Sequence, residues 1–100
     1  MNTAKLDQWL EAHLPEYLED LKRLVNINSE WSETQEGAPF GLGNAECAAA
    51  AMEIVKRCGL SAKNYDNYAV TAELAPELSR QLDILAHLDV VPAGDGTFIP

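Results

Sequence analysis

One nearly all-apolar run decides the fold, and it reads Leu82-Asp83-Ile84-Leu85-Ala86-His87-Leu88-Asp89-Val90-Val91. A short apolar run of this kind is typical of a strand that is buried on both faces of an α/β sheet. Pro92, Gly94 and Gly96 follow it, and these residue types rarely continue a central strand. We therefore expect a central-type strand over residues 82–91.

Two titratable side chains, His87 and Asp89, interrupt this run. Residues two apart on a strand project to the same face, and ligands bind at the carboxyl ends of strands in open α/β sheets. A neutral imidazole is a good zinc ligand, and a neighbouring carboxylate can fix its tautomer. The alternative is that His87 packs in the core and Asp89 caps a loop. A His-x-Asp triplet by itself does not decide between the two.

Upstream, apolar residues recur at steps of three and four from Leu6 to Val25, which predicts a helix with one apolar stripe. Thr3 is the expected N-cap, and we expect the stripe to pack in the core. His13 falls within the stripe, so we interpret it as a packing residue rather than a metal ligand. Pro15 either kinks this helix or begins a second one.

A long loop over residues 26–43 separates this helix from the next, and loops of this length are often functional. We expect Trp31 and Phe40 to anchor it to the core. The second helix is expected to begin with Asn44 as its cap and to end at Gly59. Its alanine-rich body would allow close packing against a sheet.

The apolar period then changes to two, which predicts a short strand over Ser61–Tyr65, a turn at Asp66-Asn67 and a second strand over Tyr68–Leu74. The expected fold class is α/β: two helices, a β-hairpin and a central-type strand in an incomplete sheet. All residues, 1–100, would belong to one portion of a single domain.

Composition narrows the functional class. The chain has 100 residues, a net charge of −9 and 47% hydrophobic residues, so it is too apolar for a disordered segment. The acidic balance argues against nucleic-acid partners and against an anionic membrane surface. Neither a signal peptide nor a membrane span is visible. Cys47 and Cys58 would lie roughly 16 Å apart on one helix, too far for a disulfide, which fits a cytoplasmic protein.

The segment from Ile84 to Gly96 closely resembles the first metal-site motif of the co-catalytic zinc peptidases, which include aminoacylases, desuccinylases and carnosine dipeptidases. Three further stretches are similar to the PepV-like bacterial dipeptidase branch: Leu24-Val25-Asn26-Ile27-Asn28-Ser29, Pro39-Phe40-Gly41 and Tyr65-Asp66-Asn67-Tyr68. The resemblance spans nearly the whole chain, and its His-x-Asp-Val-Val-Pro segment is the most specific part.

The resemblance implies that His87 ligates one of two zinc ions, with manganese or cobalt as possible alternatives. It implies that Asp89 holds the His87 imidazole and counts as a catalytic residue. It implies further that residues 1–100 are the N-terminal portion of the catalytic domain, and that the remaining ligands and the general base lie beyond Pro100. In the family a tryptophan usually follows the Gly-Asp-Gly segment, whereas Thr97 and Phe98 stand there in this chain.

Two hypotheses follow. In the first, the chain is the N-terminal part of a metallopeptidase that cleaves dipeptides or short peptides, and it is inactive alone. In the second, it is a non-catalytic module derived from that family, which acts by binding a partner or by self-association. In both cases too few strands accompany residues 82–91, so we expect exposed apolar surface.

Overall fold

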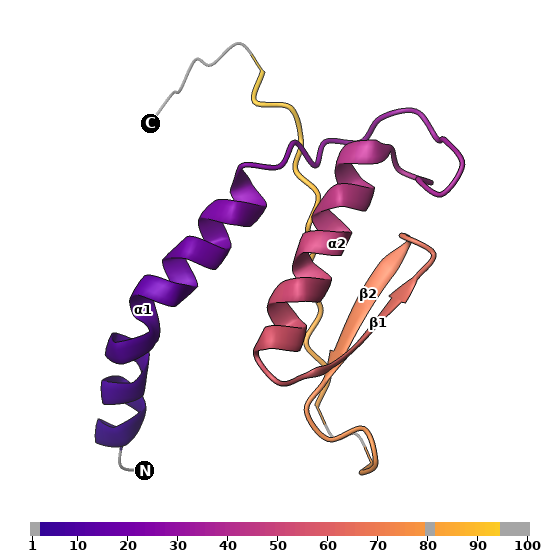
Figure 1. The fold of residues 1–100 in the computed structure, drawn as a ribbon. Helices are drawn as coiled ribbons and strands as arrows, with labels where there is room; N and C mark the ends of the chain where they lie inside the picture. The colour runs from indigo at the N-terminus through magenta and orange to yellow at the C-terminus, as the bar shows by residue number, and fades with distance from the viewer. Residues whose placement is uncertain (1–2, 80–81, 95–100) are drawn as a thin grey trace.

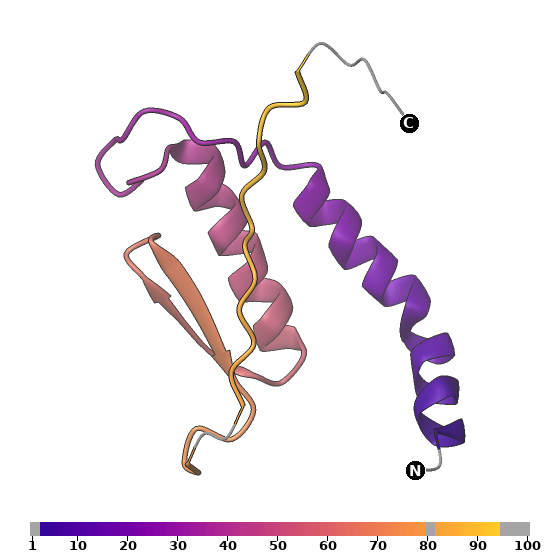
Figure 2. The ribbon, with the colours of Figure 1, turned by 180° about the vertical axis from the view of Figure 1, so that it is seen from behind.

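The computed structural model describes residues 3–79 and 82–94. It contains two helices followed by a two-stranded antiparallel sheet, which confirms the expected α/β class (Figure 1). The elements are α1 (Ala4–Val25), α2 (Leu42–Arg57), β1 (Ser61–Tyr65) and β2 (Ala69–Glu73). The hairpin lies against one side of α2, and α1 lies on the other side (Figures 1 and 2).

Helix α1 is a single helix with Pro15 inside it, so the sequence does not begin a second helix there. Proline lacks the N–H that would bond four residues back, and both views show the helix axis bending within its length (Figures 1 and 2). Thr3 occupies the N-cap position as expected, but its side chain makes no capping hydrogen bond.

No residue of α1 is buried. The prediction that its apolar stripe packs in the core is therefore wrong for the described residues: Trp9 is 57% exposed and Leu14 is 50% exposed. The helix is linked to α2 instead by ion pairs of Arg23 with Glu53 and of Arg57 with Asp20. These contacts join charged side chains and leave the apolar stripe uncovered.

Most of the buried residues lie on helix α2. Its buried residues are small: Cys47, Ala48, Ala50 and Ala51. The helix begins two residues before the expected cap, because Gly41 takes the N-cap position with a φ of 100° that favours glycine. The predicted capping role of Asn44 is therefore wrong, and its side chain has another function described below.

The hairpin matches its prediction closely. Strands β1 and β2 pair antiparallel, from Ser61 opposite Glu73 to Tyr65 opposite Ala69. The turn residues Asp66 and Asn67 have φ values of 55° and 63°, a left-handed conformation, and the N–H of Tyr68 closes the turn by donating to the oxygen of Tyr65 at 2.9 Å.

Residues 82–91 are extended but do not form the expected strand. Within the described part of the chain, one isolated parallel bridge joins Glu30 to Val90, and no ladder forms along the segment. A strand needs a neighbouring strand to pair with its N–H and C=O groups, and α2, which runs beside this segment, cannot supply one (Figure 2). The central-type strand is thus corrected to an extended segment, and the incomplete sheet is confirmed.

The chain is open for its size. Its accessible surface is 8553 Å², whereas a compact protein of this mass exposes about 5,600 Å². Its radius of gyration is 16.4 Å, against about 13 Å for a compact chain of this length. Leu85 is 96% exposed, so the expected exposed apolar surface is confirmed. Among the described helices, none is long and apolar enough to cross a membrane.

Candidate functional site

His87 and Asp89 line a groove of about 510 Å³. Its walls come from four segments: the loop before α2, the first turns of α2, the hairpin turn with the start of β2, and residues 85–89. Trp31 and Tyr68 are among the aromatic residues that line it, and Asn44 contributes a polar group. The tertiary structure thus brings the two predicted site residues into a concave surface.

The two site side chains lie together, as their spacing predicts. The His87 Nδ1 atom is 2.9 Å from the backbone oxygen of Asp89 and 3.4 Å from its Oδ1 atom. A carbonyl oxygen can only accept a hydrogen bond, so Nδ1 carries the proton in this contact. In the neutral imidazole the Nε2 lone pair is then free, and the His87 side chain is 83% exposed.

The backbone around this pair is held by a buried serine that sequence reasoning missed. Ser29 is 1% exposed, and its hydroxyl donates to the oxygen of Leu88 at 3.1 Å. The N–H of Val90 lies 3.4 Å from the oxygen of Ser29. Asn44 in turn donates from Nδ2 to that same oxygen at 2.8 Å. These partners are up to 59 residues apart, so no local sequence pattern indicates them.

Aromatic side chains form one wall of the groove. Phe40 is 38% exposed and meets Tyr68 edge to face, with ring centroids 5.4 Å apart, so it attaches its loop to the hairpin and not, as expected, to the buried core. Asn67 also ties the loop to the hairpin turn by donating to the oxygen of Gly37 at 2.7 Å. Trp31 is 66% exposed, so its prediction as an anchor is wrong, and it lines the open groove.

The described residues do not by themselves form a cluster that could hold a metal ion. Among them, no three His, Cys, Asp or Glu side chains come close enough to hold a metal ion. A zinc ion takes about four ligands, so His87 fits as one ligand and cannot be the whole set. The departure at Thr97 and Phe98 lies outside the described residues.

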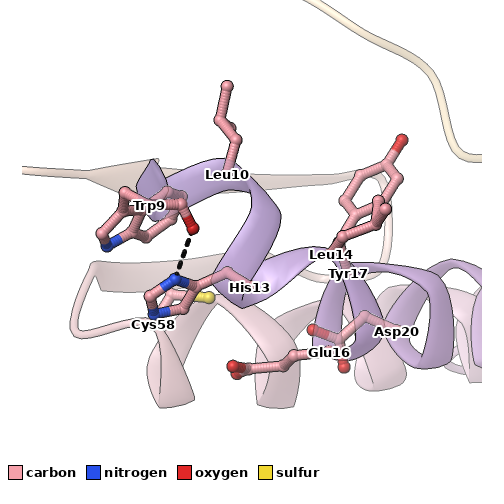
Figure 3. Close-up of a pocket in the computed structure, with 8 residues that line it drawn as sticks. All are labelled: Trp9, Leu10, His13, Leu14, Glu16, Tyr17, Asp20 and Cys58. Carbon is pink, nitrogen blue, oxygen red and sulfur yellow. Dashed lines mark hydrogen bonds between the residues drawn. The ribbon is translucent and has the colours of Figure 1, made fainter. Parts of the chain in front are cut away.

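The second histidine lies in a different groove, of about 610 Å³, between α1 and the end of α2 (Figure 3). His13 stacks on Trp9 with ring centroids 4.0 Å apart, and its Nδ1 is 2.8 Å from the Trp9 oxygen. The two histidines line separate cavities, so they do not share a set of ligands.

Both cysteines are free thiols, as their predicted separation requires. Cys47 is buried beside Ser29, and burial raises the pKa of its thiol, an effect that the Ser29 hydroxyl partly opposes. Cys58 is exposed and lines the groove between α1 and α2 (Figure 3). Neither thiol lines the groove that holds His87.

Curated dipeptidases are similar to this chain. The Beta-Ala-Xaa dipeptidase of Lactobacillus delbrueckii subsp. lactis is 36% identical over 90 residues, which cover 86% of this chain and 18% of the relative. The "Putative dipeptidase" of Staphylococcus epidermidis is 41% identical over 81 residues, covering 79% of this chain and 17% of the relative. The protein YtjP of Bacillus subtilis, whose name also describes a dipeptidase, is 35% identical over 81 residues.

The chain spans less than a fifth of the length of these relatives. No family model matches it, and no solved structure does. The aligned residues nevertheless cover most of the chain at more than a third identity. The resemblance to the bacterial dipeptidases drawn from the sequence motifs is confirmed: the chain is similar to these proteins over a short part of their length.

Proposed function

We propose that this chain forms part of a metal-dependent dipeptidase, in which His87 binds a metal ion and Asp89 holds its imidazole. The observation that carries the proposal is the orientation of His87. Its Nδ1 faces the Asp89 oxygen at 2.9 Å, and Nε2 remains available to a ligand. In metal-binding histidines the nitrogen that does not bind the metal usually donates to such an acceptor.

Zinc is the metal that we propose, with manganese or cobalt as alternatives, because imidazole and carboxylate ligands suit all three. A bound pair of such ions would activate a water molecule and polarise the scissile carbonyl. The residues of this chain have a more limited task. His87 contributes one ligand, and Asp89 fixes the tautomer that leaves Nε2 unprotonated.

The proposed substrates are dipeptides or short peptides, because the similar proteins are named as dipeptidases. The name of the Lactobacillus relative makes peptides with N-terminal β-alanine the first ones to test. Location in the cytoplasm is part of the proposal, since both thiols are unpaired.

The test begins with the DNA that follows codon 100. The proposal expects an open reading frame, and the protein that it encodes should hydrolyse β-alanyl dipeptides in the presence of zinc, manganese or cobalt. His87→Ala should lower kcat/KM by about a thousandfold, because a metal ligand is lost. His13→Ala is the matched control, since His13 lines a different groove, and it should retain activity.

Asp89→Ala removes the carboxylate that lies 3.4 Å from Nδ1 but leaves the backbone acceptor at 2.9 Å in place. It should therefore lower kcat/KM by only about 10-fold, the low end of the effect of losing a group that orients a metal ligand. The 100-residue chain alone should show no turnover, because its described residues bring no three ligands together. Turnover by this chain that disappears in His87→Ala would contradict the proposal that this chain holds only part of the active site.

The exposed apolar surface favours one other function, that of a non-catalytic module that associates through α1. Trp9 and Tyr17 are 57% and 60% exposed on this helix. A stop codon directly after codon 100, together with a concentration-dependent oligomer, would support the module and reject the enzyme.

A further inference from the structure

We propose that Ser29 is a positioning residue for His87. It holds the backbone of residues 82–91, here called the site segment, and Asn44 holds Ser29. This inference rests on the proposed role of His87. It concerns which residues of the chain determine where that imidazole lies.

The first step is the contact between Ser29 and the site segment. The Ser29 hydroxyl donates to the oxygen of Leu88, and the N–H of Val90 points to the oxygen of Ser29. Leu88 and Val90 are the two neighbours of Asp89 in the chain. Ser29 therefore binds the backbone immediately before and immediately after the residue whose oxygen accepts from His87.

The second step is that few other described contacts hold this segment. Residues 82–91 form no ladder, and their one bridge, between Glu30 and Val90, directly adjoins Ser29. Leu82 is 79% exposed and Val91 is 82% exposed, so apolar packing does not fix the ends of the segment. The hydrogen bonds of Ser29 thus carry much of its attachment.

The third step is that Ser29 itself is held firmly. Its side chain is 1% exposed, and Asn44 donates from Nδ2 to the oxygens of Ser29 and Glu30 at 2.8 and 3.1 Å. Helix α2 approaches closely here, because a Cβ atom on Gly43 would lie 1.9 Å from the oxygen of Asn28. Buried polar groups that are fully bonded in this way fix one arrangement of the backbone.

The contacts of Ser29 affect the hydrogen bond that orients the His87 ring. The Asp89 oxygen accepts from Nδ1 only while the backbone on both sides of Asp89 keeps its direction. Loss of the Ser29 hydroxyl should loosen that backbone, because only the contact of Val90 with the Ser29 backbone oxygen then remains, and the His87 ring should keep the acceptor that fixes its tautomer for less of the time.

The test uses the 100-residue chain without metal, and it compares Ser29→Ala with the unmodified protein by NMR at pH 8.5. Long-range ¹H–¹⁵N spectra report the tautomer of His87, and amide exchange reports the attachment of Val90. In Ser29→Ala the fraction of the Nδ1–H tautomer should fall, and exchange at Val90 should become about threefold to tenfold faster.

Thr34→Val is the matched control. The Thr34 hydroxyl also donates to a backbone oxygen, that of Pro39 at 2.7 Å, but it does not touch the site segment. This variant should leave the His87 tautomer and the Val90 exchange rate unchanged. Asn44→Ala provides a second test of the same chain of contacts, and it should shift both signals in the same direction as Ser29→Ala.

An unchanged His87 tautomer in both Ser29→Ala and Asn44→Ala would overturn the proposal. Equal acceleration at Val90 and at Tyr68, whose N–H bonds to Tyr65 in the hairpin, would also overturn it, because that result indicates general unfolding. These signals require neither metal nor turnover. A failure of the dipeptidase proposal is therefore distinguishable from a failure of the positioning role.

Discussion

The two helices of this chain have opposite relations to their surroundings. Helix α2 is built from small residues, four of which are buried, and it lies so close to the preceding loop that Gly43 has no room for a side chain. Helix α1 is longer and carries large apolar residues, yet none of its residues is buried. Ion pairs such as that of Arg57 with Asp20 link it to α2.

This difference shows that an apolar stripe identifies a surface that needs cover without identifying what covers it. The alanines of α2 are covered because the hairpin and the site segment lie against that helix (Figures 1 and 2). The larger stripe of α1 finds no such layer among the described residues. We call α2, the hairpin and residues 82–91 the closed side of the molecule, and α1 the open side. Four predictions test the contrast between the two.

The largest expected effect is at Gly43. In an exposed helix, Gly→Ala stabilises by about 1 kcal/mol. Here the new Cβ would lie 1.9 Å from the Asn28 oxygen, so Gly43→Ala should destabilise instead, by about 3 kcal/mol. Urea unfolding measures the change. Ala49→Gly, on the exposed face of α2, is the control and should cost only about 1 kcal/mol. A stabilised Gly43→Ala variant would show that the close contact is absent.

The two cysteines report on the two sides. Cys47 is buried with a raised pKa, whereas Cys58 is exposed beside α1. Because the thiolate is the reactive form, we expect iodoacetamide at pH 8 to modify Cys58 about 100-fold faster than Cys47. Mass spectrometry of the digested chain measures both rates. In urea the difference should disappear, and equal rates without urea would mean that the closed side opens readily.

The open side should promote association. Leu14 is 50% exposed in the α1 stripe, and chains that leave such a stripe uncovered tend to self-associate. Leu14→Gln should weaken self-association about tenfold, measured by sedimentation equilibrium. Leu78→Gln alters an exposed leucine outside the stripe, 66% exposed in a turn, and should have little effect. A monomer at all concentrations for the unmodified chain would contradict this expectation.

The smallest effect should come from the ion pairs. Arg57 contacts Asp20 and lies 3.7 Å from Glu16, so Arg57→Gln should loosen α1 and speed its amide exchange slightly. The closed side should be unaffected, and added salt should reproduce the change in the unmodified protein. Lys56→Gln removes the same charge at the neighbouring position and serves as the control. Faster exchange across the hairpin in either variant would be inconsistent with separate sides.

Local patterns predicted the parts of the fold that depend on near neighbours. The pattern predicts the hairpin with its turn at Asp66-Asn67. Both signals, the apolar period of two and the turn-forming residues, depend on positions close together in the chain. The pairing of His87 with Asp89 also follows from a spacing of two in an extended chain. Asn44 was misassigned as a cap, because its actual acceptors, the oxygens of Ser29 and Glu30, lie in a different segment.

The sequence by itself determined the two helices, the hairpin and the adjacency of His87 and Asp89, since each depends on periodicity or on residues close in the chain. The tertiary structure alone decided that residues 82–91 form no ladder with another described strand, that the α1 stripe is exposed, and that Ser29 holds the site segment. These features depend on which distant segments meet. Burial and hydrogen-bond partners are properties of the folded chain, and local sequence patterns do not indicate them.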